Sequence, residues 1–311
     1  MPVHPPMKHP SFIRPLLCIL LLCLYIGCKP EQQATGAKNI NQNTRGAAQR
    51  LELPHLDASH LFRTYTTSYE GKEAVTFSME YDPSKRHAKW VAYTFDKSTA
   101  QKNWSRGDWA KGDPFRTDPL LPKEVCIGHA EHRNDPYDRG HLCASEDRVY
   151  SQDANAQTFY YSNISPQLEA FNQRGPWYEL EKKVRAWGGC EAQVAPLGNT
   201  LYVVKGGTIR DGEFYDSRGK HGVIVKNPKK MNGLVVPAHF FVALVSQQGN
   251  TYTGIAFYLD HKDYDKGYRL ADYALSIDHL EALTGIDFFC NFPDKIEEQI
   301  ESKYAPSLWG F

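Results

Sequence analysis

The chain has 311 residues, of which 41% are apolar and 13% aromatic, and this composition predicts a globular protein and excludes a wholly disordered one. Its 36 basic residues balance its 36 acidic residues, so no overall electrostatic field favours a polyanionic partner. Any contact with nucleic acid must therefore come from a local basic groove.

Residues 1–28 have the pattern of an export signal. Two basic residues precede an uninterrupted run of 11 apolar residues at 16–26. A membrane-spanning helix needs about 20 apolar residues, so this run is too short for a permanent transmembrane anchor. The stretch 24–28 (LYIGC) resembles the cleavage box of bacterial lipoproteins, in which Cys28 becomes lipidated and forms the new N-terminus. An ordinary secretory signal that ends near Gly27 is the alternative, and both predict an exported protein of the bacterial periplasm or cell surface.

Residues 29–50 are predicted to be a flexible tether, and residues 51–311 one folded domain. The tether is polar and rich in Gln, Asn, Gly and Ala, so it cannot bury enough surface to offset the entropy cost of ordering. After Leu51, neither an internal repeat nor a second low-complexity linker divides the chain. In an oxidising compartment the cysteines of this domain could form up to two disulfides, with the pairing left open: Cys126, Cys143, Cys190 and Cys290.

Short runs with high β propensity predict a central antiparallel sheet. Runs 75–79 and 90–95 flank the turn-like stretch 82–85, which predicts a hairpin. Further apolar runs, bounded by Gly, Asn or Pro, have the pattern of buried strands: 201–204, 239–245 and 254–259.

Helices are predicted at two places beside this sheet. Pro176 suits the first position of a helix whose apolar residues repeat along one side: Trp177, Leu180, Val184 and Trp187. Glu181 and Arg185 are four apart beside that stripe, so they can present a carboxylate and a guanidinium together. The second helix runs from a Ser276 cap to Gly285. The predicted fold class is α+β, with a central antiparallel sheet flanked by helices.

The side chains best suited to catalysis are concentrated in residues 137–148 (YDRGHLCASEDR). Hydrolysis of a phosphodiester needs a base for water, positive charge on the phosphoryl oxygens and stabilisation of the leaving alkoxide. His141 can supply the base because the unperturbed pKa of histidine is about 6.5, and arginine with a divalent metal can supply the rest. Taken alone, such a charged stretch is more often a solvated loop.

Further motifs follow in order at 162–167 (SNISPQ), 171–177 (FNQRGPW) and 180–185 (LEKKVR). Together with 138–141 (DRGH), they resemble the non-specific DNA/RNA endonuclease family, which includes the Serratia-type nucleases and mitochondrial endonuclease G. The resemblance covers most of residues 51–293. It implies a ββα-metal active site that hydrolyses the phosphodiester bonds of DNA and RNA without sequence specificity and leaves 5′-phosphate ends.

The resemblance also implies roles for single residues. His141 would be the general base that activates water, and Asn172 the direct protein ligand of a Mg²⁺ ion, for which Mn²⁺ or another divalent cation could substitute. Glu181 would hold water molecules of that ion, and Arg185 would stabilise the charged phosphoryl group. Asn172 and Glu181 are nine residues apart, one more than the family pattern, and the extra loop residue would be absorbed before Pro176.

The resemblance implies supporting roles for other residues. Asn163 would orient the histidine or the water molecules of the metal, and Arg139 with Asp138 would hold the geometry of the site. The family also places an upstream arginine near the phosphate. Arg116 is the nearest candidate, but its register does not match, and the role is left unassigned.

The implied partners are the DNA and RNA backbones, because such a site reads phosphates rather than base edges. A lipidated Cys28 would make a membrane a further partner. The sequence does not determine which face of the membrane holds the protein, whether it forms a homodimer, or whether it prefers DNA or RNA. The alternative function is a catalytically silent surface lipoprotein that binds nucleic acid or a protein partner. The presence of a base, a metal ligand, an acid and an arginine argues against it.

A zinc site is a rival interpretation of some of the same residues, which include suitable ligand types: Cys126, His129, His132, His141 and Cys143. In an exported chain, cysteines more often form disulfides, so this interpretation is the weaker one.

The aromatic residues near the motifs could form a platform on which bases stack: Tyr160, Tyr161, Trp177 and Tyr178. The β propensity of residues 159–161 favours an ordinary strand there instead.

Overall fold

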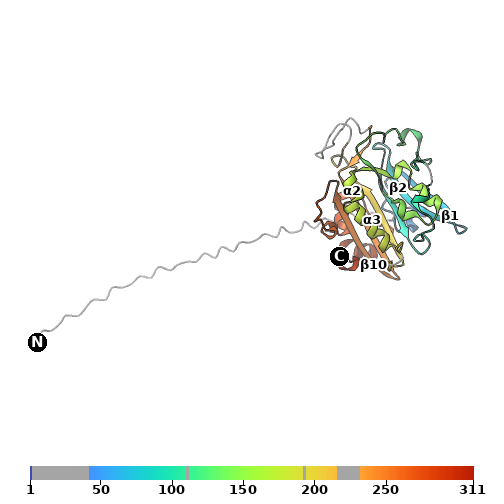
Figure 1. Ribbon diagram of the computed structural model, residues 1–311. Helices are drawn as coiled ribbons and strands as arrows, with labels where there is room; N and C mark the ends of the chain where they lie inside the picture. The colour runs from blue at the N-terminus through green and yellow to red at the C-terminus, as the bar shows by residue number, and fades with distance from the viewer. Residues whose placement is uncertain (2–41, 110–111, 192–193, 216–231) are drawn as a thin grey trace. The chain divides into compact units, whose positions relative to one another are not determined.

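The computed structural model describes residues 1, 42–109, 112–191, 194–215 and 232–311 (Figure 1). The predicted export signal with Cys28, and the tether up to residue 41, lie outside the described residues. Within the described residues, no helix is long and apolar enough to cross a membrane.

A seven-stranded antiparallel sheet, counted over the described residues, lies at the centre of the fold. Its order is β1-β2-β3-β6-β9-β10-β11. The predicted hairpin is confirmed as β2 and β3, and the predicted buried runs lie in β6, β9 and β10. The strands are β1 (Leu61–Tyr69), β2 (Lys72–Asp82), β3 (His87–Phe95), β6 (Thr200–Gly207), β9 (His239–Gln248), β10 (Thr251–Asp260) and β11 (Ala274–Leu275).

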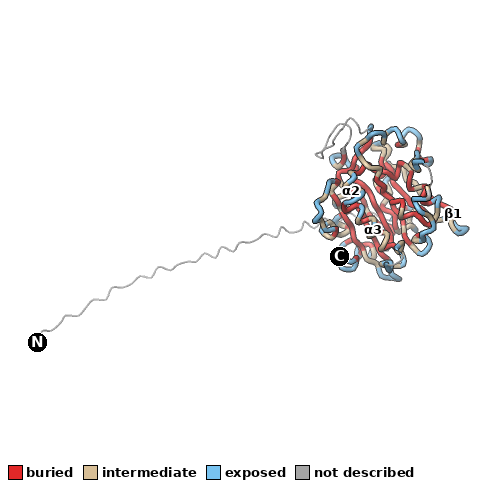
Figure 2. Tube along the Cα trace, viewed as in Figure 1, coloured by how far each residue is buried: buried red, intermediate tan, exposed pale blue. Residues whose placement is uncertain are grey.

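Both faces of this sheet are covered, because successive residues of a strand point to opposite sides. On β3, Val91 and Tyr93 belong to one buried cluster, whereas Trp90 and Ala92 belong to the other. The inner strands β2, β3, β6 and β9 are accordingly buried along most of their length, whereas the edge strands β1 and β11 are mostly half-buried (Figure 2).

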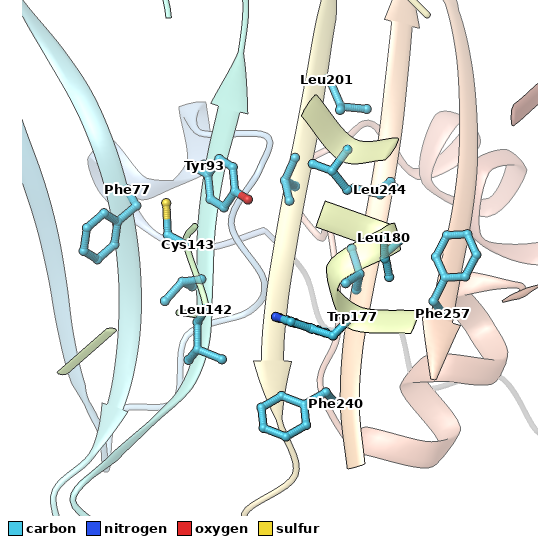
Figure 3. Close-up of a cluster of buried hydrophobic side chains, with 14 of the residues drawn as sticks. Phe77, Tyr93, Leu142, Cys143, Trp177, Leu180, Leu201, Phe240, Leu244 and Phe257 are labelled. Carbon is cyan, nitrogen blue, oxygen red and sulfur yellow. The ribbon is translucent and has the colours of Figure 1, made fainter. Parts of the chain in front are cut away.

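Both predicted helices are confirmed, as α3 (Pro176–Trp187) and α4 (Ile277–Thr284). The apolar stripe of α3 packs on one face of the sheet, and Figure 3 shows Trp177 and Leu180 among side chains of the strands. α4 packs on the opposite face together with α5 (Asp294–Ser302). The Ser276 hydroxyl accepts a hydrogen bond from the backbone of His279, and α4 ends at Gly285 in the left-handed conformation.

Short elements connect these layers. The remaining α-helices are α1 (Gln152–Gln157) and α2 (Glu169–Gln173), and small antiparallel pairs join β4 (Asp138–His141) to β5 (Ile164–Gln167) and β7 (Phe214–Tyr215) to β8 (Val236–Pro237). The 3₁₀ turns are η1 (Arg45–Gln49), η2 (Arg106–Asp108), η3 (Lys123–Val125), η4 (Ser145–Arg148), η5 (Tyr161–Asn163), η7 (Leu270–Tyr273) and η8 (Pro306–Trp309).

The folded domain begins earlier than Leu51. Asn43 is buried, its side-chain amide donates to the Pro54 carbonyl at 2.9 Å, and its backbone N–H donates to Asn291 Oδ1 at 3.0 Å. Polar side chains that form hydrogen bonds with backbone groups thus hold residues 43–50 against the domain. This segment has no apolar periodicity, so the sequence pattern does not identify it as folded.

The expected disulfides do not form, since all four cysteines of the described residues carry free thiols: Cys126, Cys143, Cys190 and Cys290. Sγ of Cys126 lies 3.3 Å from the Pro122 carbonyl, and Sγ of Cys290 lies 3.4 Å from the Asn43 amide. These thiols pack against backbone and amide groups rather than against another thiol.

The predicted strand at residues 159–161 is wrong. Phe159 lies in a turn after α1, and Tyr161 opens the 3₁₀ turn η5. Asn163 closes this turn, because its amide donates to the Thr158 carbonyl at 2.8 Å and its backbone N–H donates to the Tyr160 carbonyl at 2.9 Å. A local side-chain bond therefore overrides β propensity here.

Candidate active site

The four sequence motifs meet in one ββα unit. β4 carries DRGH and pairs with β5, so that Asp138 lies opposite Gln167 and His141 opposite Ile164. α2 and α3 follow β5 along the chain, and α2 contacts β4. Strand pairing therefore brings the end of β4 next to the helices that carry the other motifs.

Gly140 explains why two of these motifs belong together. A Cβ atom at this position would lie 2.1 Å from Oε1 of Gln167, whose side chain is fully buried across the strand pair. The glycine of DRGH and the glutamine of SNISPQ thus form one close cross-strand contact that only glycine permits.

Replacement of Gly140 by alanine should lower the free energy of unfolding by about 1–3 kcal/mol, because the added methyl group overpacks the buried Gln167. Urea denaturation of the purified variant measures the change. Gly46→Ala is the matched control, since a Cβ at Gly46 meets nothing within 4 Å. Equal midpoints for the two variants would refute the packing argument.

A cavity of about 570 Å³ opens at this unit. It is lined by nearly all of the predicted site residues, contributed by β4, α2 and α3: Arg139, His141, Asn172, Glu181 and Arg185. Asn163 does not line it. The cavity wall also includes Asp138, which is predicted to hold the geometry of the site, and Tyr178 of the proposed stacking platform. Its other residues have no predicted role: Arg106, Phe115, Ala144, Ser145, Glu146 and Gln173.

His141 lies in the cavity wall between aromatic rings. The ring centroids of Phe115 and Phe159 are 5.5 and 5.2 Å from its own. Burial, assisted by the positive charge of Arg106, lowers the pKa of His141 to about 3. Its buried Nε2 has no hydrogen-bond partner among the described residues. The imidazole is therefore neutral at physiological pH, which is the form that can accept a proton.

Asn172 lies in the short helix α2, which is not among the helices predicted from the sequence. Its Nδ2 donates to Asp138 Oδ2 at 2.9 Å, and Gln173 donates to the same oxygen at 2.7 Å. Because the amide nitrogen is held by Asp138, Oδ1 of Asn172 is turned away from that carboxylate. The extra residue of the motif, Arg174, ends α2 and separates it from α3.

Glu181 and Arg185 stand one turn apart on the cavity side of α3, as the sequence predicts. Burial raises the pKa of Glu181 to about 7, although the positive charges of Lys205 and Arg185 oppose this shift. Arg185 Nη1 lies 3.3 Å from Oδ1 of Asp147, which fixes one edge of the guanidinium.

Asp147 and Lys205 form a buried ion pair beneath Arg185. Neither side chain is exposed, and Lys205 Nζ lies 3.1 Å from Asp147 Oδ2, which also accepts the Tyr93 hydroxyl. Burial opposes ionisation of Asp147, yet Lys205 and Arg185 hold the pKa of this carboxyl below its ordinary value. The sequence contains one signal for this pair, because Lys205 interrupts an apolar strand and a buried lysine needs a partner.

Asn163 lies behind the cavity and supports the backbone that follows His141. Its Oδ1 accepts the Cys143 N–H at 2.8 Å, and its Nδ2 donates to the Cys143 carbonyl at 2.9 Å. Asn163 thus holds the chain two residues after His141 rather than contacting the imidazole or the cavity.

The arginines upstream of His141 do not all lie where the sequence analysis places them. Arg139 lies 3.9 Å from the Phe115 ring centroid and pairs with Asp113. Arg106 lines the cavity, whereas Arg116 lies over the Tyr160 ring at 5.0 Å and does not line it. Of these two upstream arginines, Arg106 is therefore the one at the cavity wall, and the sequence around it has no periodicity that reveals this.

The rival zinc ligands do not gather. Among the described residues, the clusters of three or more suitable ligands are Asp57, His60 and Glu80, and Asp278, Glu281 and Glu301. His129 Nδ1 instead faces the Tyr161 hydroxyl at 3.3 Å, and His132 Nδ1 lies 3.3 Å from Asp135.

The base-stacking platform is also incomplete. Tyr161 and Trp177 are buried, so their rings cannot receive bases. Tyr178 is exposed and lines the cavity, and it alone of the aromatic residues proposed for that platform lies at the cavity wall.

Comparison with known proteins relates this geometry to a family. A family model described as DNA/RNA non-specific endonuclease matches residues 58–295. A mitochondrial endonuclease G of Bos taurus is 28% identical over 221 residues, covering 71% of this chain and 69% of that protein. A nuclease of Nostoc sp. is 30% identical over 227 residues, covering 73% of this chain and 76% of that protein. A chain in the crystal structure of the EndoG/EndoGI complex shares the fold, with a TM-score of 0.58, 23% identity, and coverage of 78% of this chain and 90% of that chain.

Proposed function

Because the chain belongs to the DNA/RNA non-specific endonuclease family, we propose that it is an exported, Mg²⁺-dependent nuclease that hydrolyses both DNA and RNA without sequence specificity. One observation carries this proposal. A neutral histidine, an asparagine, a glutamate and an arginine line the same cavity: His141, Asn172, Glu181 and Arg185.

The chemistry of the cavity fits a hard divalent cation. Asn172 and Glu181 offer oxygen donors, and Asp138 orients the asparagine amide. Asn172 would hold the ion directly and Glu181 through water, as suits Mg²⁺, which keeps most of its hydration shell. When bound, the ion would supply positive charge to the phosphoryl oxygens and to the leaving alkoxide.

His141 would take the proton of the attacking water. Burial against Phe115 and Phe159 keeps the imidazole unprotonated, which is the form that can accept this proton. Attack of the water oxygen on phosphorus and breakage of the bond to the 3′ oxygen would leave a 5′-phosphate and a 3′-hydroxyl. Arg185, held on one edge by Asp147, would donate hydrogen bonds to the phosphoryl oxygens.

Lack of sequence specificity follows from the groups that face the substrate. The charged donors of the cavity are Arg106, Arg139 and Arg185, and guanidinium groups bind phosphates through their charge and paired donors. Contacts to phosphates position a nucleic acid without reading its bases. The same site would therefore accept DNA and RNA strands.

We also propose that residues 1–28 direct export and that a lipid on Cys28 holds the mature enzyme at a membrane. The short apolar run and the LYIGC stretch support this proposal. Cys28→Ser should move the protein from the membrane fraction to the soluble fraction, and unchanged membrane association would refute the lipid anchor.

Cleavage assays test the proposed activity. Plasmid DNA and a structured RNA should both be degraded in Mg²⁺, and EDTA should stop the reaction. The products should become substrates for 5′ labelling by a polynucleotide kinase only after treatment with phosphatase. Binding of nucleic acid without cleavage in Mg²⁺ would favour the silent surface protein instead.

Protons should compete with the metal at Glu181. Because the pKa of this carboxyl is raised to about 7, the group is largely protonated at pH 6 and largely ionised at pH 8. The apparent Mg²⁺ affinity should fall about fivefold between pH 7 and pH 6, with release of nearly one proton per ion at the lower pH. Calorimetric titration in buffers of different ionisation enthalpy measures both quantities. If Glu181→Gln keeps the same pH slope, another group is responsible.

A further inference from the structure

A second group of carboxylates lies far along the chain from the active-site motifs, between α4 and α5. Asp278 and Glu281 belong to α4, and Glu301 belongs to the last turn of α5. One oxygen from each of these side chains lies within 4.8 Å of the others. Both helices pack on β10, on the face of the sheet opposite α3. The group is therefore separate from the cavity around His141.

Two of these carboxylates are buried, although charged groups usually stay in water. Glu281 and Glu301 are each 3% exposed. Glu281 accepts the Phe288 N–H at 2.7 Å, whereas Oε1 of Glu301 is buried without a hydrogen-bond partner among the described residues. A buried, unpaired carboxylate oxygen is costly and needs a partner.

The titratable groups that influence Glu301 most are all carboxyls. The carboxyl groups that raise its pKa, in addition to burial, are Glu281, Glu297, Asp278 and Asp287. Within the described part of the chain, no lysine, arginine or histidine forms an ion pair with Asp278, Glu281 or Glu301. Burial and mutual repulsion raise the pKa of Glu281 and of Glu301, so a cation that takes the place of their protons would relieve this repulsion.

The other ligand cluster of the described residues serves as a contrast. There, Glu80 is buried but already accepts His60 Nδ1 at 2.8 Å, and Lys89 Nζ lies 3.2 Å away. That carboxylate has positive partners within the protein. The cluster at Glu301 does not, so only the latter has the character of an incomplete site.

We propose that Asp278, Glu281 and Glu301 bind a Ca²⁺ ion that joins α4 to α5 and stabilises the fold. Three carboxylates offer up to six oxygens, which suits the six to eight oxygen ligands of Ca²⁺ better than Mg²⁺, which keeps several water molecules. The ion would give Glu301 Oε1 its missing partner. This site does not depend on the catalytic assignment.

Calcium binding is best measured in a full-length chain whose active-site ion is removed by Asn172→Ala and Glu181→Gln. After treatment with EDTA and dialysis, titration calorimetry with CaCl₂ should show one saturable site per chain. At a Ca²⁺ concentration of about 100 times Kd, the Tm should rise by roughly 5 °C. Mg²⁺ at the same concentration should raise it less.

Adding Glu301→Gln should weaken Ca²⁺ binding by at least about tenfold and reduce the shift in Tm to about half or less at the same Ca²⁺ concentration, because one charged ligand is lost. Asp278→Asn, at a half-buried position, tests the same site should the first variant fail to fold. Glu124→Gln, at an exposed position outside both helices, should leave binding unchanged. Absence of saturable binding, an equal Ca²⁺ response in the cluster variants, or an equal response to Mg²⁺ would overturn the proposal.

Discussion

His141→Ala should reduce the rate of phosphodiester cleavage by about 10²–10⁴-fold while nucleic acid still binds. The imidazole is neutral, and His141 belongs to the wall of the cavity that Asn172 and Arg185 also line. Removal of this base leaves the arginines and the metal ligands in place. The loss should therefore appear in the chemical step and not in the affinity for substrate.

Single-turnover cleavage and fluorescence anisotropy with a labelled oligonucleotide separate these two effects. His129→Ala is the matched control, because His129 is exposed and does not line the cavity. It should cleave at the rate of the unaltered chain, and circular dichroism should show both variants folded. A folded His141→Ala variant with undiminished turnover would overturn the assignment of the base.

Asp147→Asn should cost about 3–5 kcal/mol of unfolding free energy, because it leaves the fully buried Lys205 without its counter-charge. The exposed pair of Glu169 and Arg174 provides the comparison. Glu169→Gln should change stability by less than about 1 kcal/mol, since exposed ion pairs contribute little. Denaturation in urea measures both variants under the same conditions.

The double variant Asp147→Asn with Lys205→Met gives an independent check on this ion pair. Because it removes both buried charges, it should recover part of the stability lost in Asp147→Asn. Its cleavage rate should remain low, since Arg185 loses the carboxylate that holds its guanidinium. The ion-pair explanation would be contradicted if the double variant lost more unfolding free energy than the two single variants lose together.

Periodicity was sufficient to predict the scaffold of the site. The apolar stripe of α3 and the apolar runs of the strands indicate which residues are buried. The buried residues in turn determine how the helices and the sheet pack in layers. The order of the motifs likewise predicted that His141, Asn172, Glu181 and Arg185 belong to one site, and all four line the cavity.

Contacts between distant positions could not be predicted in this way. Lys205 and Asp147 are 58 residues apart, and only the tertiary packing that places η4 next to β6 brings them together. Asn163 illustrates a different difficulty, because its type suggests a place in the site. Its amide instead satisfies backbone groups of Cys143 and Thr158. When a polar side chain can form hydrogen bonds either with nearby backbone groups or across a cavity, the sequence does not determine which partner it has.

A crystal structure of the chain soaked with Mn²⁺, located by its anomalous signal, tests the proposed metal site most directly. The ion should lie about 2.0–2.3 Å from Oδ1 of Asn172, with water in most of its remaining positions and Glu181 reaching it through water. An ion in this cavity that does not contact Asn172, or one bound by His129 and His132 instead, would contradict the account.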